Sequence, residues 1–226
     1  MRARLAAMSR AVVIFGLCLA ILASCSKSGA SDGGSGASGS APKVTPSTTD
    51  NTAREQARFD AERKPEKVVE ALGIKPGSRV ADVGAGTGLL TVHLARAVAP
   101  NGTVVATDID GAVLELLHAR LDAVGLADVV ERRVVGAETP GLEAGAYDAI
   151  LLAEVDHFFQ DPVAWLQSAQ AALKPSGRIV ISNRIHHRAK SMAAAQKAGL
   201  VLLDELTPVP THFIAVFVAA PEEKKK

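Results

Sequence analysis

The chain has few cysteines, few aromatic residues and little net charge. It has two cysteines among its 226 residues, Cys18 and Cys25, and both lie in an N-terminal segment that is expected to be removed or lipidated. The domain that follows therefore has no disulfide to form, and the redox state of its compartment has no bearing on its fold. Aromatic residues make up 4% of the chain, and the formal net charge is +1. So small a charge gives no indication of nucleic-acid binding.

The first 24 residues have the pattern of an export signal. Arginines at positions 2, 4 and 10 precede an almost wholly apolar run over residues 11–23, which is short for a membrane span. The run ends in Leu-Ala-Ser-Cys at residues 22–25, which resembles a bacterial lipobox. The resemblance implies a membrane-anchored lipoprotein of the cell envelope that is lipidated at Cys25. In enteric bacteria, an aspartate directly after the lipidated cysteine tends to retain a lipoprotein at the inner membrane. Residue 26 is a serine, so the outer membrane and periplasm are favoured. An ordinary signal peptide or an uncleaved anchor is the alternative.

Composition divides the rest of the chain into a tether, a domain and a tail. Residues 25–52 are mostly Ser, Gly, Ala, Thr and Pro, and they have too few apolar side chains to fold. They are expected to form a flexible tether between the lipid and the domain. Residues 53–220 have the length of one domain, and residues 221–226 are a charged tail. The sequence gives no indication of the oligomeric state.

Helical and strand patterns alternate along residues 53–220. Helices are expected at residues 54–72, with a pause at Pro65, and at 87–97, 112–124, 162–173 and 189–198. Strands are expected at residues 79–83, 103–107, 129–135, 147–153, 178–182, 200–206 and 212–218. This alternation predicts a single α/β domain with a doubly wound, Rossmann-like, mostly parallel sheet of seven strands. No helix separates the last two strands, so they are expected to form a C-terminal antiparallel hairpin.

The most informative motif is Asp-Val-Gly-Ala-Gly-Thr-Gly at residues 82–88, between the first strand and the next helix. Glycine tolerates a positive φ, and its missing Cβ lets a ligand approach the backbone. The helix that follows offers unpaired N–H groups. The glycines stand at alternate positions, whereas a loop that seats a pyrophosphate prefers G-x-G-x-x-G. A carboxylate beside such a loop suits a ligand with a positive amino end and no phosphate.

The motif resembles the first motif of class I S-adenosylmethionine (SAM) methyltransferases, and the terminal hairpin is also found in that family. Three other segments are similar to a bacterial subgroup of the family: Lys-Pro at 64–65, Asp-Pro-Val-Ala-Trp-Leu at 161–166 and Leu-Lys-Pro-Ser-Gly-Arg at 173–178. Several members of that subgroup carry export signals. The resemblance implies SAM as the cofactor and methyl transfer to an acceptor. A small molecule is expected, although the sequence leaves quinones, lipids and protein side chains open.

The resemblance also assigns roles to the residues of the glycine loop. Gly84, Ala85, Gly86 and Gly88 are expected to run under the amino-acid part of SAM. Asp82 is expected to hold the ammonium group of SAM, directly or through water. The alternative for Asp82 is a carboxylate that caps the next helix or braces the loop.

Carboxylates after the second and third strands complete the expected cofactor site. Asp108 ends the second strand roughly 20 residues after the loop, where the family binds both ribose hydroxyls, although NAD proteins use the same device. Ile109 is then expected against the adenine, whereas Asp110 is interpreted as a helix cap. Ala137 occupies a position where many relatives have an acidic residue for the adenine amino group. Glu138 is its candidate substitute, and an exposed loop glutamate is the alternative.

The end of the fourth strand carries the candidate catalytic residues, because strand ends at this edge of an open α/β sheet form binding sites. Glu154 is expected among the cofactor contacts. Asp156 is expected to orient His157 as a general base for the acceptor. In the alternative, the two side chains point apart, and His157 lies at the rim of a packing site formed by Phe158 and Phe159.

Several alternatives concern the overall function. His186 and His187 suggest a metal, but no third ligand stands at usable spacing, so no metal is expected. The methyl donor is already activated and requires mainly alignment and exclusion of water, so the sequence need not display a base. An exported, non-catalytic ligand-binding module with the same fold is the main alternative, because SAM is made in the cytoplasm. A NAD-dependent oxidoreductase is opposed by the glycine spacing and by the hairpin.

Overall fold

The computed structural model describes residues 48–220, which belong to one compact unit. The expected signal peptide, the tether up to residue 47 and the charged tail lie outside the described residues. Within the described range, no helix is both long enough and apolar enough to cross a membrane. The first helix, α1, spans Thr48–Arg63 and so begins inside the expected tether. Its first residues are threonines, aspartate and asparagine, which suit linkers and helix starts alike.

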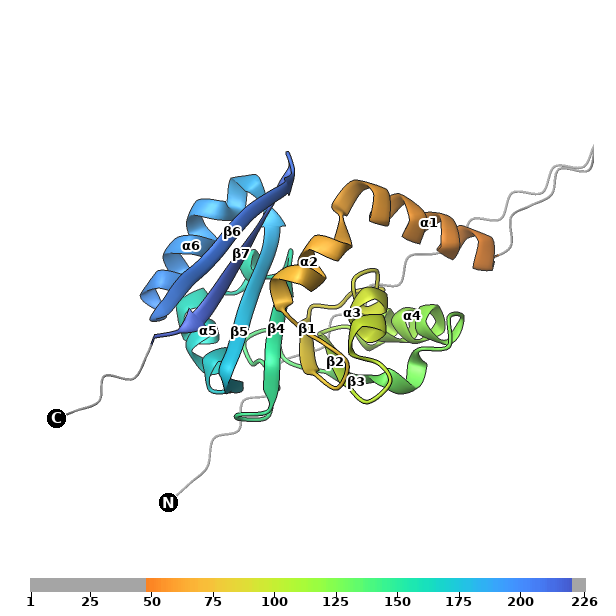
Figure 1. The fold of residues 1–226 in the computed structure, drawn as a ribbon, viewed down its shortest axis with the longest axis horizontal. Helices are drawn as coiled ribbons and strands as arrows, with labels where there is room; N and C mark the ends of the chain where they lie inside the picture. The colour runs from red at the N-terminus through yellow and green to blue at the C-terminus, as the bar shows by residue number, and fades with distance from the viewer. Residues whose placement is uncertain (1–47, 221–226) are drawn as a thin grey trace, which may run out of the picture. The chain divides into compact units, whose positions relative to one another are not determined.

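The sheet has seven strands in the order β3-β2-β1-β4-β5-β7-β6 (Figure 1). Strands β1 to β5 are parallel, and β7 pairs antiparallel with both β5 and β6. The expected doubly wound sheet with a terminal hairpin is therefore confirmed. The order reverses between β1 and β4, which is where ligands bind in open α/β sheets. The strands are β1 (Arg79–Val83), β2 (Thr103–Asp108), β3 (Val130–Val134), β4 (Tyr147–Ala153), β5 (Leu173–Arg184), β6 (Leu200–Val209) and β7 (His212–Ala219).

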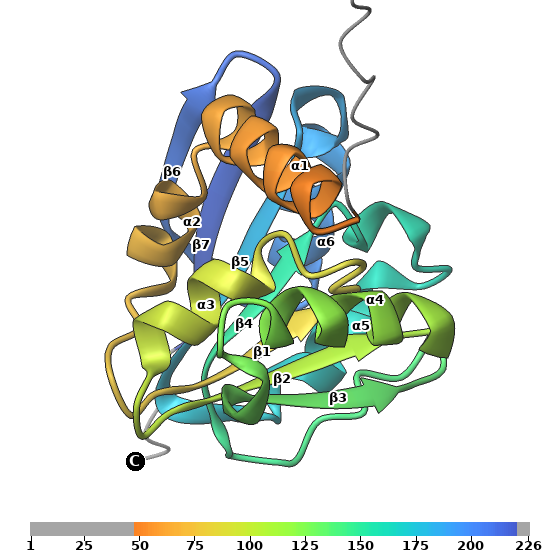
Figure 2. The same ribbon diagram turned by 90° about the vertical axis from the view of Figure 1, so that its right-hand side faces the viewer.

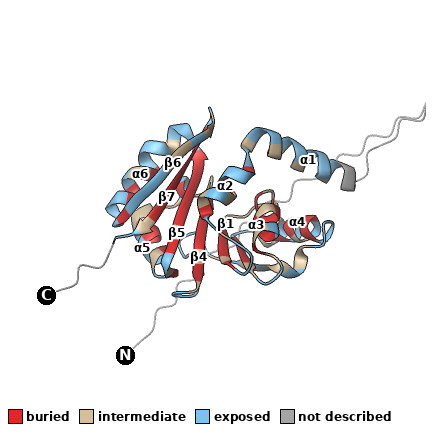
Figure 3. Ribbon diagram, viewed as in Figure 1, coloured by how far each residue is buried: buried red, intermediate tan, exposed pale blue. Residues whose placement is uncertain are grey.

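Helices cover both faces of the sheet (Figure 2). Helices α2, α3 and α4 pack on one face, and α5 and α6 pack on the other. Successive β4 residues alternate between the two cores: Leu151 belongs to the cluster with α3, and Leu152 belongs to the cluster with Trp165 of α5. The central strands are therefore buried on both sides, as parallel strands usually are (Figure 3). The bounds are α2 (Pro65–Leu72), α3 (Thr91–Val98), α4 (Gly111–Asp122), α5 (Pro162–Gln170) and α6 (Arg188–Lys197).

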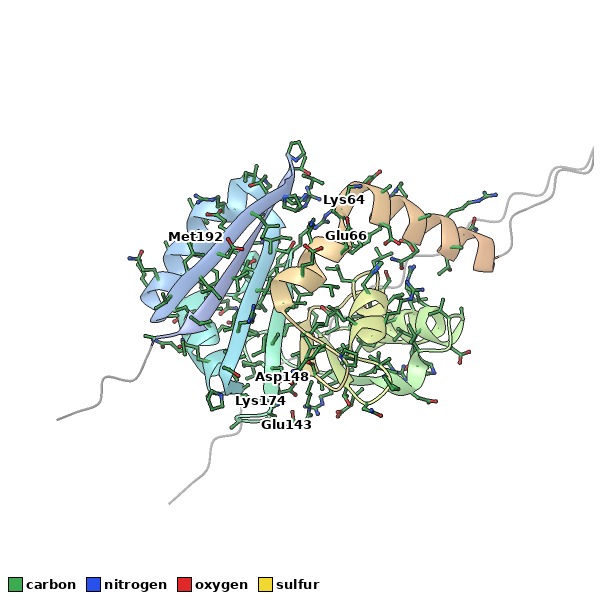
Figure 4. The ribbon with its side chains drawn as sticks, viewed as in Figure 1. Lys64, Glu66, Glu143, Asp148, Lys174 and Met192 are labelled. Carbon is green, nitrogen blue, oxygen red and sulfur yellow. The ribbon has the colours of Figure 1, made fainter. Side chains whose placement is uncertain are left out.

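Among the element boundaries that differ from the predicted ones, those of α3 and β5 have clear local reasons. Helix α3 begins at Thr91 and not at residue 87, because the glycine loop keeps a positive φ as far as Gly88. Strand β5 begins at Leu173, so the expected turn at residues 174–177 lies within the strand as an irregularity of its pairing with β4. Lys174 Nζ donates to Asp148 Oδ2 at 2.8 Å beside this irregularity, where Figure 4 shows the two side chains together.

Helix α1 is attached to the domain mainly by polar contacts. None of its residues from 51 to 63 is buried. The buried guanidinium of Arg120 donates to Glu55 at 2.5 Å, and Asp60 lies 2.8 Å from His93 Nε2. At its end, Arg63 forms an ion pair with Glu154. The carboxyl end of α1 is thus connected by charge to the end of β4.

Candidate functional site

A cavity of about 460 Å³ lies at the carboxyl ends of β1, β2 and β4, where the strand order reverses. Its volume is within the range of small-molecule sites. Most of its lining is apolar, with a small number of polar groups among the apolar side chains. The lining residues are Val83, Gly84, Thr107, Asp108, Ile109, Val135, Gly136, Ala137, Thr139, Glu154, Val155, Phe158, Phe159 and Trp165.

The glycine loop is joined to the end of β2 by backbone hydrogen bonds. Ala85 N donates to Thr107 O at 3.0 Å, and Gly86 N donates to the Asp108 carboxylate at 3.0 Å. A Cβ on Gly84 would lie 2.7 Å from Val155, and one on Gly88 would lie 2.8 Å from Leu117. These two glycines are therefore required by packing. Gly86 has a φ of +56°, and a Cβ there would meet nothing within 4 Å, so it leaves open space above the loop.

Asp82 lies behind the loop and not in the cavity lining. It is 1% exposed, and Thr91 Oγ1 donates to its Oδ2 at 2.7 Å. Burial raises the pKa of Asp82 to about 6, although the hydrogen bond from Thr91 opposes the shift, and the nearby charge of Asp108 adds to it. Asp82 thus braces the start of α3, as in the alternative considered above. Its contact with an ammonium group stays a prediction.

Asp108 connects the loop to the next helix and also lines the cavity. Its Oδ2 accepts from Gly86 N, and its Oδ1 accepts from Asp110 N at 3.1 Å. The expected helix cap is confirmed, because Asp110 accepts from Ala112 N at 2.8 Å at the start of α4. Ile109 is 66% exposed at the cavity and offers it an apolar face.

Glu138 is not brought into the cavity. Ala137 and Thr139 line the cavity on either side of it, whereas the Glu138 side chain is exposed and accepts from Gln160 N at 3.2 Å. The structure therefore has the exposed loop glutamate that was the alternative to an adenine contact. The turn at residues 137–138 is the physical reason, because it points adjacent side chains in different directions.

Glu154 lines the cavity from the end of β4, in a left-handed conformation with a φ of +53°. Its carboxylate forms ion pairs with Arg63 and with Arg184 at 3.2 Å, and His212 Nε2 lies 3.3 Å from it. Burial acts to raise the pKa of Glu154, but the charge of Arg63 and the other cations outweigh it and lower the pKa. The side chain is ionised and bound on several sides. The expected cofactor contact stays a prediction.

Asp156 and His157 do not contact one another in the described hydrogen bonds, so the expected direct pairing is not formed. Asn183 Nδ2 lies between them, 2.6 Å from Asp156 Oδ1 and 3.1 Å from His157 Nδ1. Ser191 Oγ donates to the other oxygen of Asp156 at 2.5 Å. The reason is a short 3-10 turn over Asp156–Phe158. The turn directs the 5%-exposed Asp156 side chain inward and the exposed His157 side chain outward.

A second pocket of about 240 Å³ adjoins the first, since Glu154 and Phe158 line both. Its other lining residues are His157, Arg184, His186 and His187. The His157 and His187 rings stack at 4.1 Å and 13°. Among residues 48–220, no group of three or more His, Cys, Asp or Glu side chains is placed to hold a metal ion. The histidines thus line a small pocket that is continuous with the larger cavity through Glu154 and Phe158.

Two lining residues were not singled out from the sequence. Thr107 Oγ1 and Trp165 Nε1 are buried, and neither has a hydrogen-bond partner among the described residues. The Trp165 ring stacks on Phe159 at 4.3 Å. Buried polar atoms normally have partners, so both atoms are available to a ligand in the cavity. The one sequence signal was that Trp165 is the only tryptophan of the chain.

Comparison with known proteins assigns residues 81–179 to a family described as a methyltransferase domain. A ubiquinone biosynthesis O-methyltransferase of Xanthomonas campestris is 31% identical over 148 residues, which are 65% of this chain and 59% of that protein. A ubiquinone/menaquinone biosynthesis C-methyltransferase of Ectopseudomonas mendocina is 33% identical over 113 residues, covering 50% of this chain and 44% of that protein. The chain therefore spans about six tenths or less of the length of these relatives.

Solved structures show the same fold at lower identity. A SAM-dependent methyltransferase from Aquifex aeolicus matches with a TM-score of 0.66 and 20% identity, over 74% of this chain and 96% of that one. A geranyl diphosphate C-methyltransferase from Streptomyces coelicolor, solved with S-adenosyl-L-homocysteine, matches with a TM-score of 0.62 and 15% identity, over 75% and 82% of the two chains. These similarities establish the fold.

Proposed function

We propose that the chain is a SAM-dependent methyltransferase of class I and that it transfers a methyl group from SAM to a small-molecule acceptor. One observation carries the proposal. The cavity at the switch point of the sheet is bounded by a glycine loop, and the Asp108 carboxylate ties that loop to the end of β2. The residues matched by the family, 81–179, include every residue that lines the cavity.

The residues of the cavity fit SAM chemically. Gly86 leaves room beside the loop for the amino-acid part. Asp108 offers carboxylate oxygens suited to ribose hydroxyls, and Ile109 offers an apolar surface suited to adenine. Thr107 Oγ1 and Trp165 Nε1 are buried donors without partners among the described residues, as a site for a nucleoside requires.

When bound, SAM supplies an activated methyl group on a sulfonium. The protein residues have to hold the donor, align the acceptor and exclude water. The glycine loop and Asp108 serve the first task. The second pocket serves the others, because it shares Glu154 and Phe158 with the first. The relatives are named for ubiquinone biosynthesis, and our proposal for this chain is limited to a small-molecule acceptor.

Titration of S-adenosylhomocysteine and SAM into the purified full-length protein tests the proposal by calorimetry. We expect micromolar binding. We expect Asp108→Asn to weaken it by about 10-fold to 100-fold, because hydrogen bonds to a charged group contribute about 1.5–3 kcal/mol. Asp110→Asn is the matched control, because asparagine also caps a helix and Asp110 is no part of the cavity lining. Absence of binding by the folded protein would refute the proposal and leave the non-catalytic module.

We propose further that the protein is exported and anchored to the cell envelope through a lipid on Cys25. The support is the lipobox-like segment at residues 22–25 and the apolar run before it. In cells fed labelled palmitate, we expect the wild-type chain to carry label and to sediment with membranes, and Cys25→Ala to lose both. Cys18→Ala, which changes the chain's other cysteine, is expected to behave as wild type. An unlabelled wild-type chain would contradict the assignment.

A further inference from the structure

The buried side chain of Asn183 determines which ring nitrogen of His157 carries the proton, and the His157 ring lines the second pocket. Asn183 is fully buried in β5, and its Oδ1 accepts from Arg184 N at 2.7 Å. A backbone N–H can only donate, so the amide oxygen must face Arg184. The amide nitrogen must then face Asp156 Oδ1 at 2.6 Å and His157 Nδ1 at 3.1 Å. The orientation of the amide is thus defined by its partners.

This orientation determines the tautomer of His157. An amide nitrogen has two N–H donors and no acceptor. One N–H donates to Asp156, which Ser191 Oγ holds from its other side. The second is directed at His157 Nδ1, which must accept and is therefore unprotonated. The proton of the neutral ring is then on Nε2, so His157 is a hydrogen-bond donor and has no free lone pair at Nε2 with which to act as a base.

Three histidines lie together at this pocket. His157 stacks on His187, whose ring centre also lies 4.0 Å from that of His186. Burial lowers the pKa of His187, and the neighbouring His157 and His186 lower it further. A proton added at His157 Nδ1 would also face the N–H of Asn183. The Asn183 contact therefore favours the ring with its proton on Nε2.

A second donor lines the same pocket. Arg184 Nε is bound to Glu154 at 3.2 Å, and neither Nη of Arg184 has a partner within the described part of the chain. The Arg184 side chain is 61% exposed. The negative charge of Glu154 is shared with Arg63, which binds it from α1. Phe158, 73% exposed, adds an aromatic face to the pocket. Two donors beside an aromatic face are complementary to an aromatic carboxylate.

We propose that the second pocket binds an aromatic acceptor through a carboxylate, and that His157 is a specificity residue that donates to this carboxylate from Nε2 and removes no proton. The guanidinium of Arg184 is the second donor to the same group. The inference rests on the proposed function, because it takes the second pocket as the acceptor site. It assigns His157 a role opposite to the general base suggested by its position beside Asp156.

The tautomer is tested directly in the cofactor-free protein. In full-length protein labelled with ¹⁵N-histidine, long-range ¹H–¹⁵N NMR spectra near neutral pH should show His157 with a protonated Nε2 and an unprotonated Nδ1. The His157 signals are identified by their loss in His157→Gln. A protonated Nδ1 would overturn the assignment of His157 as a donor.

Ligand class is tested with benzoate and benzamide, which share a ring and differ in charge. Benzoate should shift the His157 resonances, and benzamide should bind at least about 10-fold more weakly. His157→Leu should weaken benzoate binding by a similar factor. His157→Gln, whose side-chain amide can donate near the position of Nε2, should retain most of it. His118→Leu on α4, outside the pocket lining, is the matched control.

Equal binding of the two probes, or benzoate binding unaffected by His157→Leu, would overturn the proposal. Failure of benzoate to shift His157 would do the same. S-adenosylhomocysteine is titrated into the wild-type protein in parallel. If it binds and benzoate does not, only the acceptor class fails. If it does not bind, the methyltransferase proposal itself fails, whatever the tautomer of His157.

Discussion

Replacing Asp82 by asparagine is expected to remove a pH-dependent loss of stability that reaches about 3 kcal/mol. Burial raises the pKa of Asp82 from 3.8 to about 6. Between these values the folded chain holds a proton that the unfolded chain has released, so the free energy of unfolding falls as the pH rises. Below the lower value both states are protonated and there is no cost. Above the upper value both are ionised and the whole cost is present.

The measurement is urea unfolding of the wild type and Asp82→Asn from about pH 4 to about pH 8. The asparagine amide adds a pH-independent difference of its own, so the informative quantity is the change in the difference between the two proteins. We expect the variant to gain about 2–3 kcal/mol relative to wild type across this range. Asp128→Asn, at an exposed carboxylate, should show no such trend. A pH-independent difference for Asp82→Asn would contradict the expectation.

Gly84→Ala and Gly88→Ala are each expected to reduce the free energy of unfolding by about 2–5 kcal/mol. Both glycines have a positive φ, which costs an L-residue about 1–2 kcal/mol. In addition, the new Cβ would lie 2.7 Å from Val155 in the first case and 2.8 Å from Leu117 in the second. Overpacking of this kind costs about 1–3 kcal/mol more. Denaturant unfolding measures the total.

Gly86→Ala separates the role of the loop in binding from its role in packing. Its positive φ carries the same strain, but its Cβ meets nothing within 4 Å, so we expect a loss of about 1–2 kcal/mol. Gly125→Ala is the matched control, with a φ of +68° and equally open space. Affinity for S-adenosylhomocysteine should fall in Gly86→Ala and not in Gly125→Ala. Equal affinities would show that the space above Gly86 is not part of the cofactor site.

Features whose residues lie close together in the sequence could be predicted from it. The glycine loop, the carboxylate at Asp108 and the cap at Asp110 all lie within a few residues of the strand or helix that positions them. The absence of a helix before the last strand was enough to predict the antiparallel hairpin. Burial of the central strands on both faces then followed from a parallel sheet covered by helices on both sides.

Features that depend on contacts between distant residues could not be predicted. Asn183 meets His157 across 26 positions of the chain, and Arg63 meets Glu154 across 91. The periodicity of a sequence does not indicate such a pairing, so the sequence predicted an interaction between the adjacent residues Asp156 and His157. Trp165 was missed for a similar reason, because a helical tryptophan is most simply explained as core.

The contacts that attach α1 to the domain determine which measurements would detect its undocking. Its contacts with Arg120, His93 and Glu154 are hydrogen bonds and ion pairs, and none of residues 51–63 is buried. Heat-capacity change and denaturant sensitivity both follow the area of surface that is exposed. Phe59 of α1 packs against the core, so undocking of α1 would expose a limited area of apolar surface and produce a small calorimetric or urea signal. Amide exchange, which reports local opening directly, is sensitive to it. The melting temperature of the domain is thus expected to report mainly the sheet and its packed helices, and amide exchange to report α1.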